Sequence, residues 1–112
     1  MGINNKEFYH ARGKKISPAI KEYHLEQNRL HNWGNCEICG VKPAVEVHHC
    51  LSQSALYIKL YPEYIHHRDN CECICRQCHQ DSPTKYTEIE FCSMFNIKPR
   101  SKSGQNKQKD WT

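Results

Sequence analysis

The sequence predicts a small α+β domain built around a metal site made of cysteines. Two Cys-x-x-Cys pairs, Cys36–Cys39 and Cys75–Cys78, are separated by 35 residues. Each pair offers two thiolates from one backbone turn, and a structural Zn²⁺ takes four such ligands at tetrahedral corners. A strand-like segment beside the pairs and helical patterns on both flanks complete the fold class. At 112 residues the chain is expected to form one domain.

A redox pair or a disulfide is the alternative reading of these cysteines. Only 38% of the residues are hydrophobic, so a metal would help to hold a small core together. No apolar run approaches the ~18 residues that a membrane span needs, and the polar N-terminus lacks a secretory signal. We therefore expect an intracellular protein, cytoplasmic or nucleoid-associated, in which the eight cysteines stay reduced and favour metal over disulfides.

Basic segments flank a mildly acidic middle. The formal net charge is +4, to which residues 1–35 contribute +3, residues 36–97 contribute −3 and residues 98–112 contribute +4. This distribution suits a polyanion such as DNA, although solvated tails would give the same pattern. We expect residues 1–17 to form a loosely ordered basic arm, residues 18–97 to form the folded domain, and residues 98–112 to form a disordered basic tail.

A helix is predicted from Pro18 to about Asn32. Ser17 has the side chain of an N-cap, and proline is favoured at the first helical position. The helix has a partial apolar face: Ile20, Tyr23, Leu25 and Leu30. Trp33 and Gly34 should end it, and we expect Trp33 to cover the zinc site as a core residue rather than to stack on nucleic-acid bases.

The segment 44–50 alternates like a β-strand and contains the pair His48–His49. Alternation points these two side chains to opposite faces. Both can serve one site only if the strand ends or bends at this point. A short helix over 52–61 and an irregular loop over 64–69 are expected to follow.

A second strand is predicted over 71–75. Its Cys71 and Cys73 are expected to be small buried residues behind the hairpin, the alternative being that Cys73 replaces one of the zinc ligands. A short helix should begin near Arg76 and carry His79. A last helix over 84–95 presents a predicted core stripe: Tyr86, Ile89, Cys92 and Phe95.

The order Cys-x-x-Cys, His-His, Asn, Cys-x-x-Cys-His resembles the HNH endonucleases of the ββα-metal type that carry a four-cysteine zinc site. The matching positions are Cys36, Cys39, His48, His49, Asn70, Cys75, Cys78 and His79. The resemblance implies a ββα-metal core bracketed by the zinc site, with flanking helices. It covers about residues 35–85, so neither end of the chain is included.

The resemblance also implies roles for these residues. His49 would be the general base for hydrolysis of a DNA phosphodiester bond, and Asn70 would orient the His49 ring or its supporting loop. His48 and His79 would bind a catalytic Mg²⁺, Mn²⁺, Ni²⁺, Co²⁺ or Zn²⁺. Arg68 and Arg76 are expected to contact phosphate. A homodimer would be one way to cut both strands.

The chain departs from the family pattern at two positions. Many members carry His or Asn one helical turn after the final His, where this chain has Pro83, and others carry Asp where this chain has His48. His66 and His67 form a competing pair, but they lack the strand that precedes His48. The alternative functions are a non-catalytic zinc module that binds nucleic acid or protein, and a redox-responsive protein that uses Cys71 and Cys73.

Overall fold

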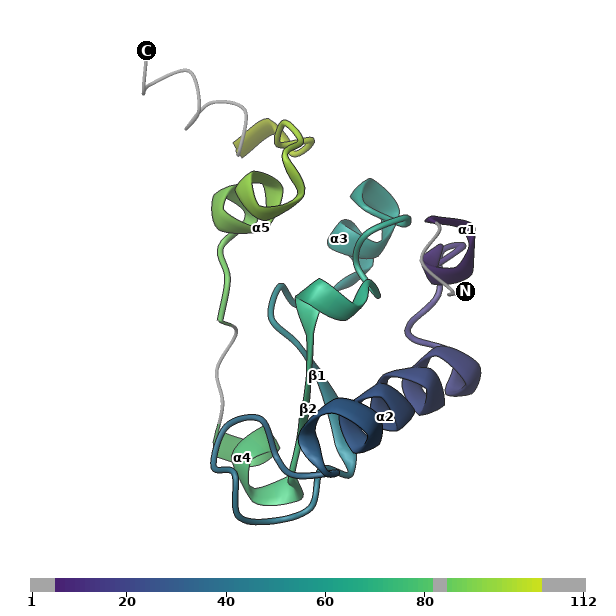
Figure 1. Cartoon of the computed structure of the whole chain (residues 1–112). Helices are drawn as coiled ribbons and strands as arrows, with labels where there is room; N and C mark the ends of the chain where they lie inside the picture. The colour runs from purple at the N-terminus through teal and green to yellow at the C-terminus, as the bar shows by residue number, and fades with distance from the viewer. Residues whose placement is uncertain (1–5, 82–84, 104–112) are drawn as a thin grey trace.

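The predicted fold class, small α+β, is confirmed by a computed structural model that describes residues 6–81 and 85–103 (Figure 1). In chain order the elements are α1 (Lys6–Tyr9), α2 (Pro18–Asn32), β1 (Glu46–His49), α3 (Ala55–Leu60), the 3₁₀-helix η1 (Arg68–Asn70), β2 (Cys71–Ile74), α4 (Arg76–Asp81) and α5 (Glu88–Phe95). No helix among these residues is both long enough and apolar enough to cross a membrane.

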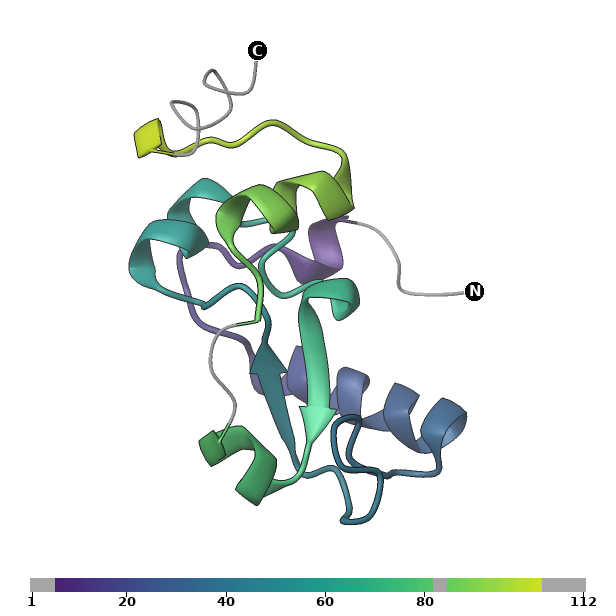
Figure 2. The same cartoon turned by 90° about the vertical axis from the view of Figure 1, so that its left-hand side faces the viewer.

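The two strands form an antiparallel sheet in the middle of the molecule. Glu46 pairs with Ile74, Val47 with Cys73, His48 with Glu72 and His49 with Cys71. Figures 1 and 2 show α2 on one side of this sheet and α4 on the other. The sheet therefore has two faces with different neighbours, and side chains that alternate along a strand meet different helices.

Helix α2 has the predicted ends but a different buried face. It runs from Pro18 to Asn32, and the Ile20 N–H donates to the Ser17 hydroxyl over 3.2 Å, as expected of an N-cap. Its buried residues are Ile20, His24 and Asn28, which lie one turn apart. Leu30, expected on the apolar face, is 67% exposed. The buried stripe of α2 is therefore largely polar. Tertiary hydrogen bonds pair His24 Nε2 and Asn28 Nδ2, whereas His24 Nδ1 and Asn28 Oδ1 have no partner among the described residues.

The prediction that Trp33 covers the zinc site is wrong. Trp33 is 89% exposed and takes the left-handed conformation (φ 59°, ψ 18°) that ends α2. This conformation directs the side chain away from the body of the protein. The helix thus ends with a tryptophan at a position where glycine is the usual residue.

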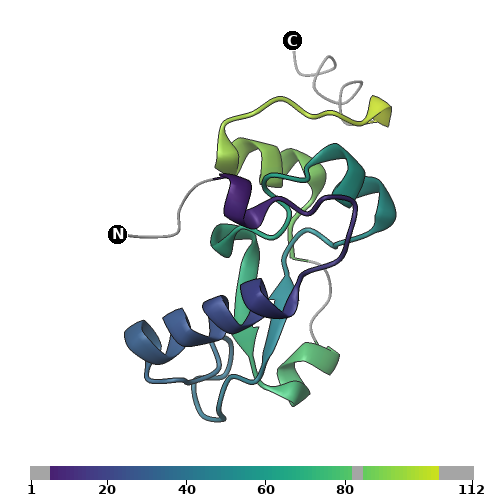
Figure 3. The same cartoon turned by 90° about the vertical axis from the view of Figure 1, so that its right-hand side faces the viewer.

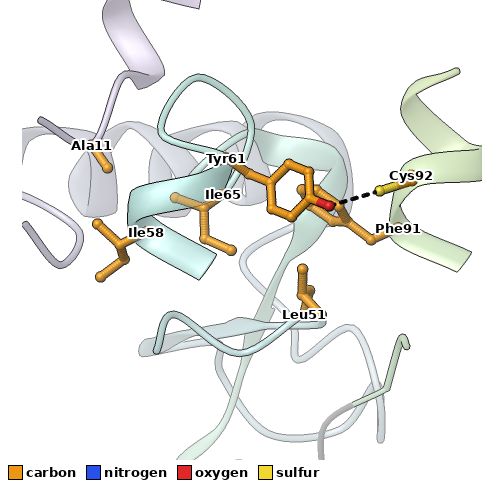
Figure 4. Close-up of a cluster of buried hydrophobic side chains, with 7 residues drawn as sticks. All are labelled: Ala11, Leu51, Ile58, Tyr61, Ile65, Phe91 and Cys92. Carbon is orange, nitrogen blue, oxygen red and sulfur yellow. Dashed lines mark hydrogen bonds between the residues drawn. The ribbon is translucent and has the colours of Figure 1, made fainter. Parts of the chain in front are cut away.

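The main hydrophobic core lies at one end of the hairpin, between α3, α5 and the segment after α1. Its buried members are Ala11, Leu51, Ile58, Tyr61, Ile65, Phe91 and Cys92 (Figure 4). The predicted stripe on the last helix is largely right, since Cys92 is buried and Tyr86 and Phe95 pack against this core, but Phe91 rather than Ile89 enters it. Helix α5 also starts later than predicted, at Glu88, because Thr87 and Glu90 form a capping box.

Both basic ends of the chain pack against this core more closely than the sequence suggested. From α1 onward, Tyr9 and Ala11 are buried, and the Ala11 N–H donates to Pro62 O over 2.6 Å. After α5, the Arg100 N–H donates to the Tyr61 hydroxyl over 2.7 Å, and the Arg100 guanidinium pairs with Glu63. Parts of residues 6–17 and 98–103 therefore contact the folded domain (Figure 3). The rest of the predicted arm, residues 1–5, and of the predicted 98–112 tail, residues 104–112, lies outside the described residues.

The left-handed conformation of Trp33 gives the first testable prediction. Trp33→Gly should raise the free energy of unfolding by about 1 kcal/mol, since glycine adopts positive φ without a steric cost and the lost indole is exposed. Chemical denaturation measures this. Leu30→Gly, an exposed site inside the same helix, is the matched control and should lower stability by about 1 kcal/mol. A loss of stability in Trp33→Gly would mean that the indole packs against the protein.

Candidate metal centre and histidine site

The four cysteines of the two Cys-x-x-Cys pairs come together at the end of the hairpin opposite the hydrophobic core. The Sγ atoms of Cys36, Cys39, Cys75 and Cys78 all lie within 4.8 Å of one another. Cys39 Sγ and Cys75 Sγ are 4.0 Å apart, close to the separation of about 3.8 Å that tetrahedral zinc–thiolate ligation requires. The four thiols therefore form a cluster that can hold a metal ion such as Zn²⁺.

Backbone N–H groups point at the sulfurs in both knuckles. The N–H groups of Ile38 and Cys39 each donate to Cys36 Sγ over 3.4 Å, and the Cys78 N–H donates to Cys75 Sγ over the same distance. Burial acts to raise the pKa of Cys36, but these amide donors outweigh it and lower that pKa to about 6. The first knuckle thus favours the thiolate form, which is the form that binds metal. In the second knuckle, the hydrogen bond with the Cys75 thiol raises the pKa of Cys78 to about 12, so metal binding there must displace a proton.

Glu37, inside the first knuckle, connects the metal centre to the rest of the domain. Its carboxylate accepts hydrogen bonds from the Asn28 side chain of α2, from the Arg68 guanidinium and from the Cys73 backbone N–H of β2. The Glu37 N–H in turn donates to Cys73 O over 2.9 Å. The position of the knuckle is therefore fixed relative to both the helix and the hairpin.

Cys71 and Cys73 lie on the α2 face of the hairpin, where they pack with Val47 as buried residues. The Cys73 thiol donates to His24 O over 3.2 Å, and Cys73 is not part of the four-sulfur cluster. Burial raises the pKa of Cys73 to about 12. These two cysteines are thus buried packing residues, as the sequence predicted.

His48 and His79 meet on the α4 face of the hairpin. Their rings lie 5.6 Å apart at an angle of 75°. Glu46, two residues before His48, accepts a hydrogen bond from His79 Nδ1. Alternation along β1 puts Glu46 and His48 on one face, and the short helix α4 brings His79 over them. The two histidines that the resemblance assigns to a catalytic metal are therefore neighbours.

Two further donors beside His48 were not singled out from the sequence. Cys50 and Glu72 each place a ligand atom within 4.8 Å of His48 and of one another. Cys50 lies two residues after His48, and Glu72 is the cross-strand partner of His48. The first could have been found from its spacing, whereas the second requires the strand register.

His49 lies on the opposite face of the hairpin from His48, as alternation predicts. It is 6% exposed, and burial lowers its pKa to about 3. Its Nε2 is 2.9 Å from His66 Nδ1, while His66 Nε2 is 3.0 Å from Lys14 O. Since a carbonyl only accepts, Nε2 of neutral His66 carries the proton, and its Nδ1 accepts from His49. The sequence treated His66 as a competing site, but the structure pairs it with His49.

Asn70 is fully buried and holds the chain that follows His49. Its Oδ1 accepts from the Leu51 N–H over 2.8 Å, and its Nδ2 donates to Leu51 O and Ile65 O over 3.2 and 2.9 Å. Asn70 therefore closes the base of the loop between β1 and β2. These hydrogen bonds go to the loop and not to the His49 ring.

The two arginines expected to contact phosphate have partners within the chain. Arg68 donates to Glu37 and to Cys71 O, which ties it to the hairpin. Arg76 is 76% exposed and pairs with Glu46 over 3.4 Å. Of the two, only Arg76 has a side chain that is largely open to solvent.

No protein-family model, no curated protein and no solved structure matches this chain.

The sulfur cluster predicts one tightly held zinc ion per chain after gel filtration in metal-free buffer. Cys75→Ala should lose this ion and unfold the domain, since a structural zinc site supplies about 10–16 kcal/mol of binding free energy in small zinc domains. Elemental analysis and circular dichroism measure both effects. Cys71→Ala, a buried cysteine of the same hairpin, is the matched control and should retain the metal. A folded, zinc-free protein would refute the metal centre.

Burial of His24 predicts that stability falls in mild acid. Burial lowers its pKa to about 4, so the unfolded chain takes up a proton before the folded protein does, and the free energy of unfolding decreases as pH drops below about 6.5. His24 should account for about 2 kcal/mol of the loss between pH 7 and pH 5.

Denaturation at a series of pH values tests this. The free energy of unfolding of His24→Gln, minus that of wild type, should increase as the pH falls from 7 to 5. Loss of zinc in acid would affect both proteins and cancel in this difference. His31→Gln removes an exposed histidine of the same helix as a control. Parallel pH profiles for wild type and His24→Gln would contradict the assignment.

Proposed function

We propose that this chain is a metal-dependent endonuclease that hydrolyses DNA phosphodiester bonds, either nicking one strand or cutting both. The observation that carries the proposal is the meeting of His48 and His79 on a strand–strand–helix unit whose end carries the four-cysteine cluster. The order of residues and elements is the one that the resemblance to HNH endonucleases implies. A cleaved double strand would require a homodimer or two successive reactions.

His48 and His79 are the proposed ligands of the catalytic ion, which we leave open among Mg²⁺, Mn²⁺, Ni²⁺, Co²⁺ and Zn²⁺. The imidazole pair fits divalent transition metals, because imidazole is a borderline ligand that suits Zn²⁺, Ni²⁺ and Co²⁺ better than Mg²⁺. Such an ion supplies charge relief to the phosphoryl group and the departing 3′-oxygen. The products would be 5′-phosphate and 3′-hydroxyl ends.

His49 is the proposed general base, since neutral imidazole accepts a proton from water. Because His49 lies on the opposite face of the hairpin from His48 and His79, this role requires the end of β1 to bend so that both faces reach one phosphate. Its Nε2–H is directed to His66, which leaves Nδ1 as the nitrogen with a free lone pair. His66 holds the ring in this tautomer, and Asn70 fixes the backbone two residues further on. The His66 side chain and the loop closed by Asn70 thus hold His49 in one orientation.

A cavity lined in part by His66 supports DNA as the partner. It has a volume of about 670 Å³, and its lining combines apolar side chains with three cations, Arg12, Lys14 and Lys15. The cations are exposed, and the N-terminus of α2 opens into the cavity. Exposed cations and a helix N-terminus both favour phosphate.

A non-catalytic zinc module that binds nucleic acid or protein is the second candidate. The observation that favours it is the burial of His49, which is 6% exposed and already hydrogen-bonded. Incubation of purified protein with plasmid and Mg²⁺, Mn²⁺ or Ni²⁺, with EDTA as control, separates the two candidates. Cleavage that EDTA abolishes supports the nuclease, and DNA binding without cleavage supports the module.

Two histidine variants separate the proposed base from the proposed ligand. His49→Ala should slow cleavage by ~10²–10⁴-fold and recover in part at higher pH, where hydroxide replaces the activated water. The defect of His79→Ala should ease at high metal concentration and change little with pH. Rates with saturating DNA measure both. His31→Ala, an exposed histidine, is the control.

The assignment fails if His67→Ala abolishes cleavage while His49→Ala does not. It also fails if none of these variants affects the rate, because the activity would then come from a contaminant. His66→Ala is expected to resemble His49→Ala in a weaker form, since His66 acts only by orienting the ring.

A further inference from the structure

We propose that Cys50 and Glu72 join His48 as protein ligands of a second metal site, which takes a divalent ion of the Zn²⁺, Co²⁺ or Ni²⁺ class. The proposal names ligands for the ion that the proposed function assigns to His48 and His79, and to that extent it rests on that function. The site lies on the α4 face of the hairpin and shares no residue with the four-cysteine cluster.

Strand geometry brings these three side chains together. Cys50 lies two residues after His48, in the bend just past the end of β1, and its thiol is within 4.8 Å of the His48 ligand atom. Glu72 is paired with His48 across the sheet, and paired residues of antiparallel strands lie side by side on one face. An imidazole from β1, a carboxylate from β2 and a thiol from the bend after β1 therefore converge, with all their ligand atoms within 4.8 Å.

His48 carries the clearest sign that this cluster is built for a ligand. It is 8% exposed, and its buried Nδ1 has no hydrogen-bond partner among the described residues. Glu72 Oε1 faces it at 3.8 Å, too far for a hydrogen bond. Two ligands of one tetrahedral zinc ion lie about 3.4 Å apart, so a small approach of the two groups would let one ion satisfy both.

The other two donors are held in place by the surrounding chain. The Cys50 N–H donates to Asn70 O over 2.7 Å, and Cys50 O accepts from the N–H groups of Lys85 and Tyr86 over 2.9 Å. Lys85 Nζ donates to Glu72 Oε2 over 2.9 Å, which leaves Oε1 toward His48. Such fixed donors cost little to organise when an ion binds.

Glu46 prepares His79 to complete the shell. Because a carboxylate only accepts, the hydrogen bond between Glu46 and His79 places the ring proton on Nδ1 and leaves Nε2 free to ligate. A carboxylate behind a metal-binding histidine is a common outer-sphere arrangement. Thiolate and imidazole ligands together favour Zn²⁺, Co²⁺ and Ni²⁺ over Mg²⁺.

Cobalt binding tests the proposal without any measurement of cleavage. Full-length protein holding one zinc is titrated with Co²⁺, and the near-ultraviolet spectrum is followed for the charge-transfer band of a cobalt–thiolate bond. We expect one further ion per chain with this band, while the zinc content stays at one. Binding without the band, or no binding, would overturn the proposal.

Substitutions of the proposed ligands test which residues give rise to the cobalt–thiolate band. Cys50→Ala should remove it, and Glu72→Gln should weaken Co²⁺ binding by more than ~100-fold, the upper end of what loss of an outer-sphere partner costs. Cys92→Ala and Glu63→Gln, a buried thiol and a paired carboxylate in the hydrophobic core region, should change neither. Retained zinc and an unchanged circular dichroism spectrum show that each variant is folded.

The proposal and the nuclease can fail separately. If the cobalt–thiolate band appears but plasmid is not cut, the metal site stands and the nuclease falls. If plasmid is cut in a metal-dependent way but Cys50→Ala binds Co²⁺ as wild type does, the nuclease stands and the ligand set proposed here is wrong.

Discussion

The rest of the structure depends on the four thiols that bring residues 36–39 to residues 75–78. The hairpin between them has only four residue pairs, and an isolated two-stranded hairpin is marginal in water. Bound metal would fix one end of it, with Glu37 linking the knuckle to α2 and to β2. The hydrophobic cluster around Tyr61 and Phe91 fixes the other end. The chain thus holds a very short sheet in one register with few apolar residues.

That register divides the histidines into two environments. On the α2 face, His24, His49 and His66 are buried, and each is linked by a hydrogen bond to the chain around it. On the α4 face, His48 retains an unpartnered nitrogen and His79 is oriented by Glu46. The first set stabilises the packing of α2 and the loop, although His24 Nδ1 also has no partner among the described residues. The second set differs in having a thiol and a carboxylate beside its unpartnered nitrogen. A slip of one residue would exchange these roles.

Features that depend on local chemistry could be predicted from the sequence. Ser17 and Pro18 correctly marked the start of α2, and the Cys-x-x-Cys spacing correctly brought four sulfurs together. Features that depend on tertiary partners could not. The buried face of α2 could not be predicted because His24 Nε2 hydrogen-bonds to the carbonyl of His66, 42 positions away. Glu72 could not be placed beside His48 because the register depends on how the two strands pair, which neither strand's sequence determines by itself. The position of Trp33 was predicted wrongly because the hydrophobic character of its side chain suggested burial, whereas the residue occupies the left-handed position that ends α2 and is exposed.

X-ray absorption at the zinc edge, on protein with one zinc per chain, is the sharpest test of the four-cysteine site. We expect four sulfur scatterers at about 2.3 Å and no lighter atom bound directly to the zinc. A shell containing nitrogen or oxygen would mean that a histidine or a carboxylate has replaced one of Cys36, Cys39, Cys75 and Cys78. In that case the knuckles would not be joined as described, and the geometry assigned to the hairpin would lose its support.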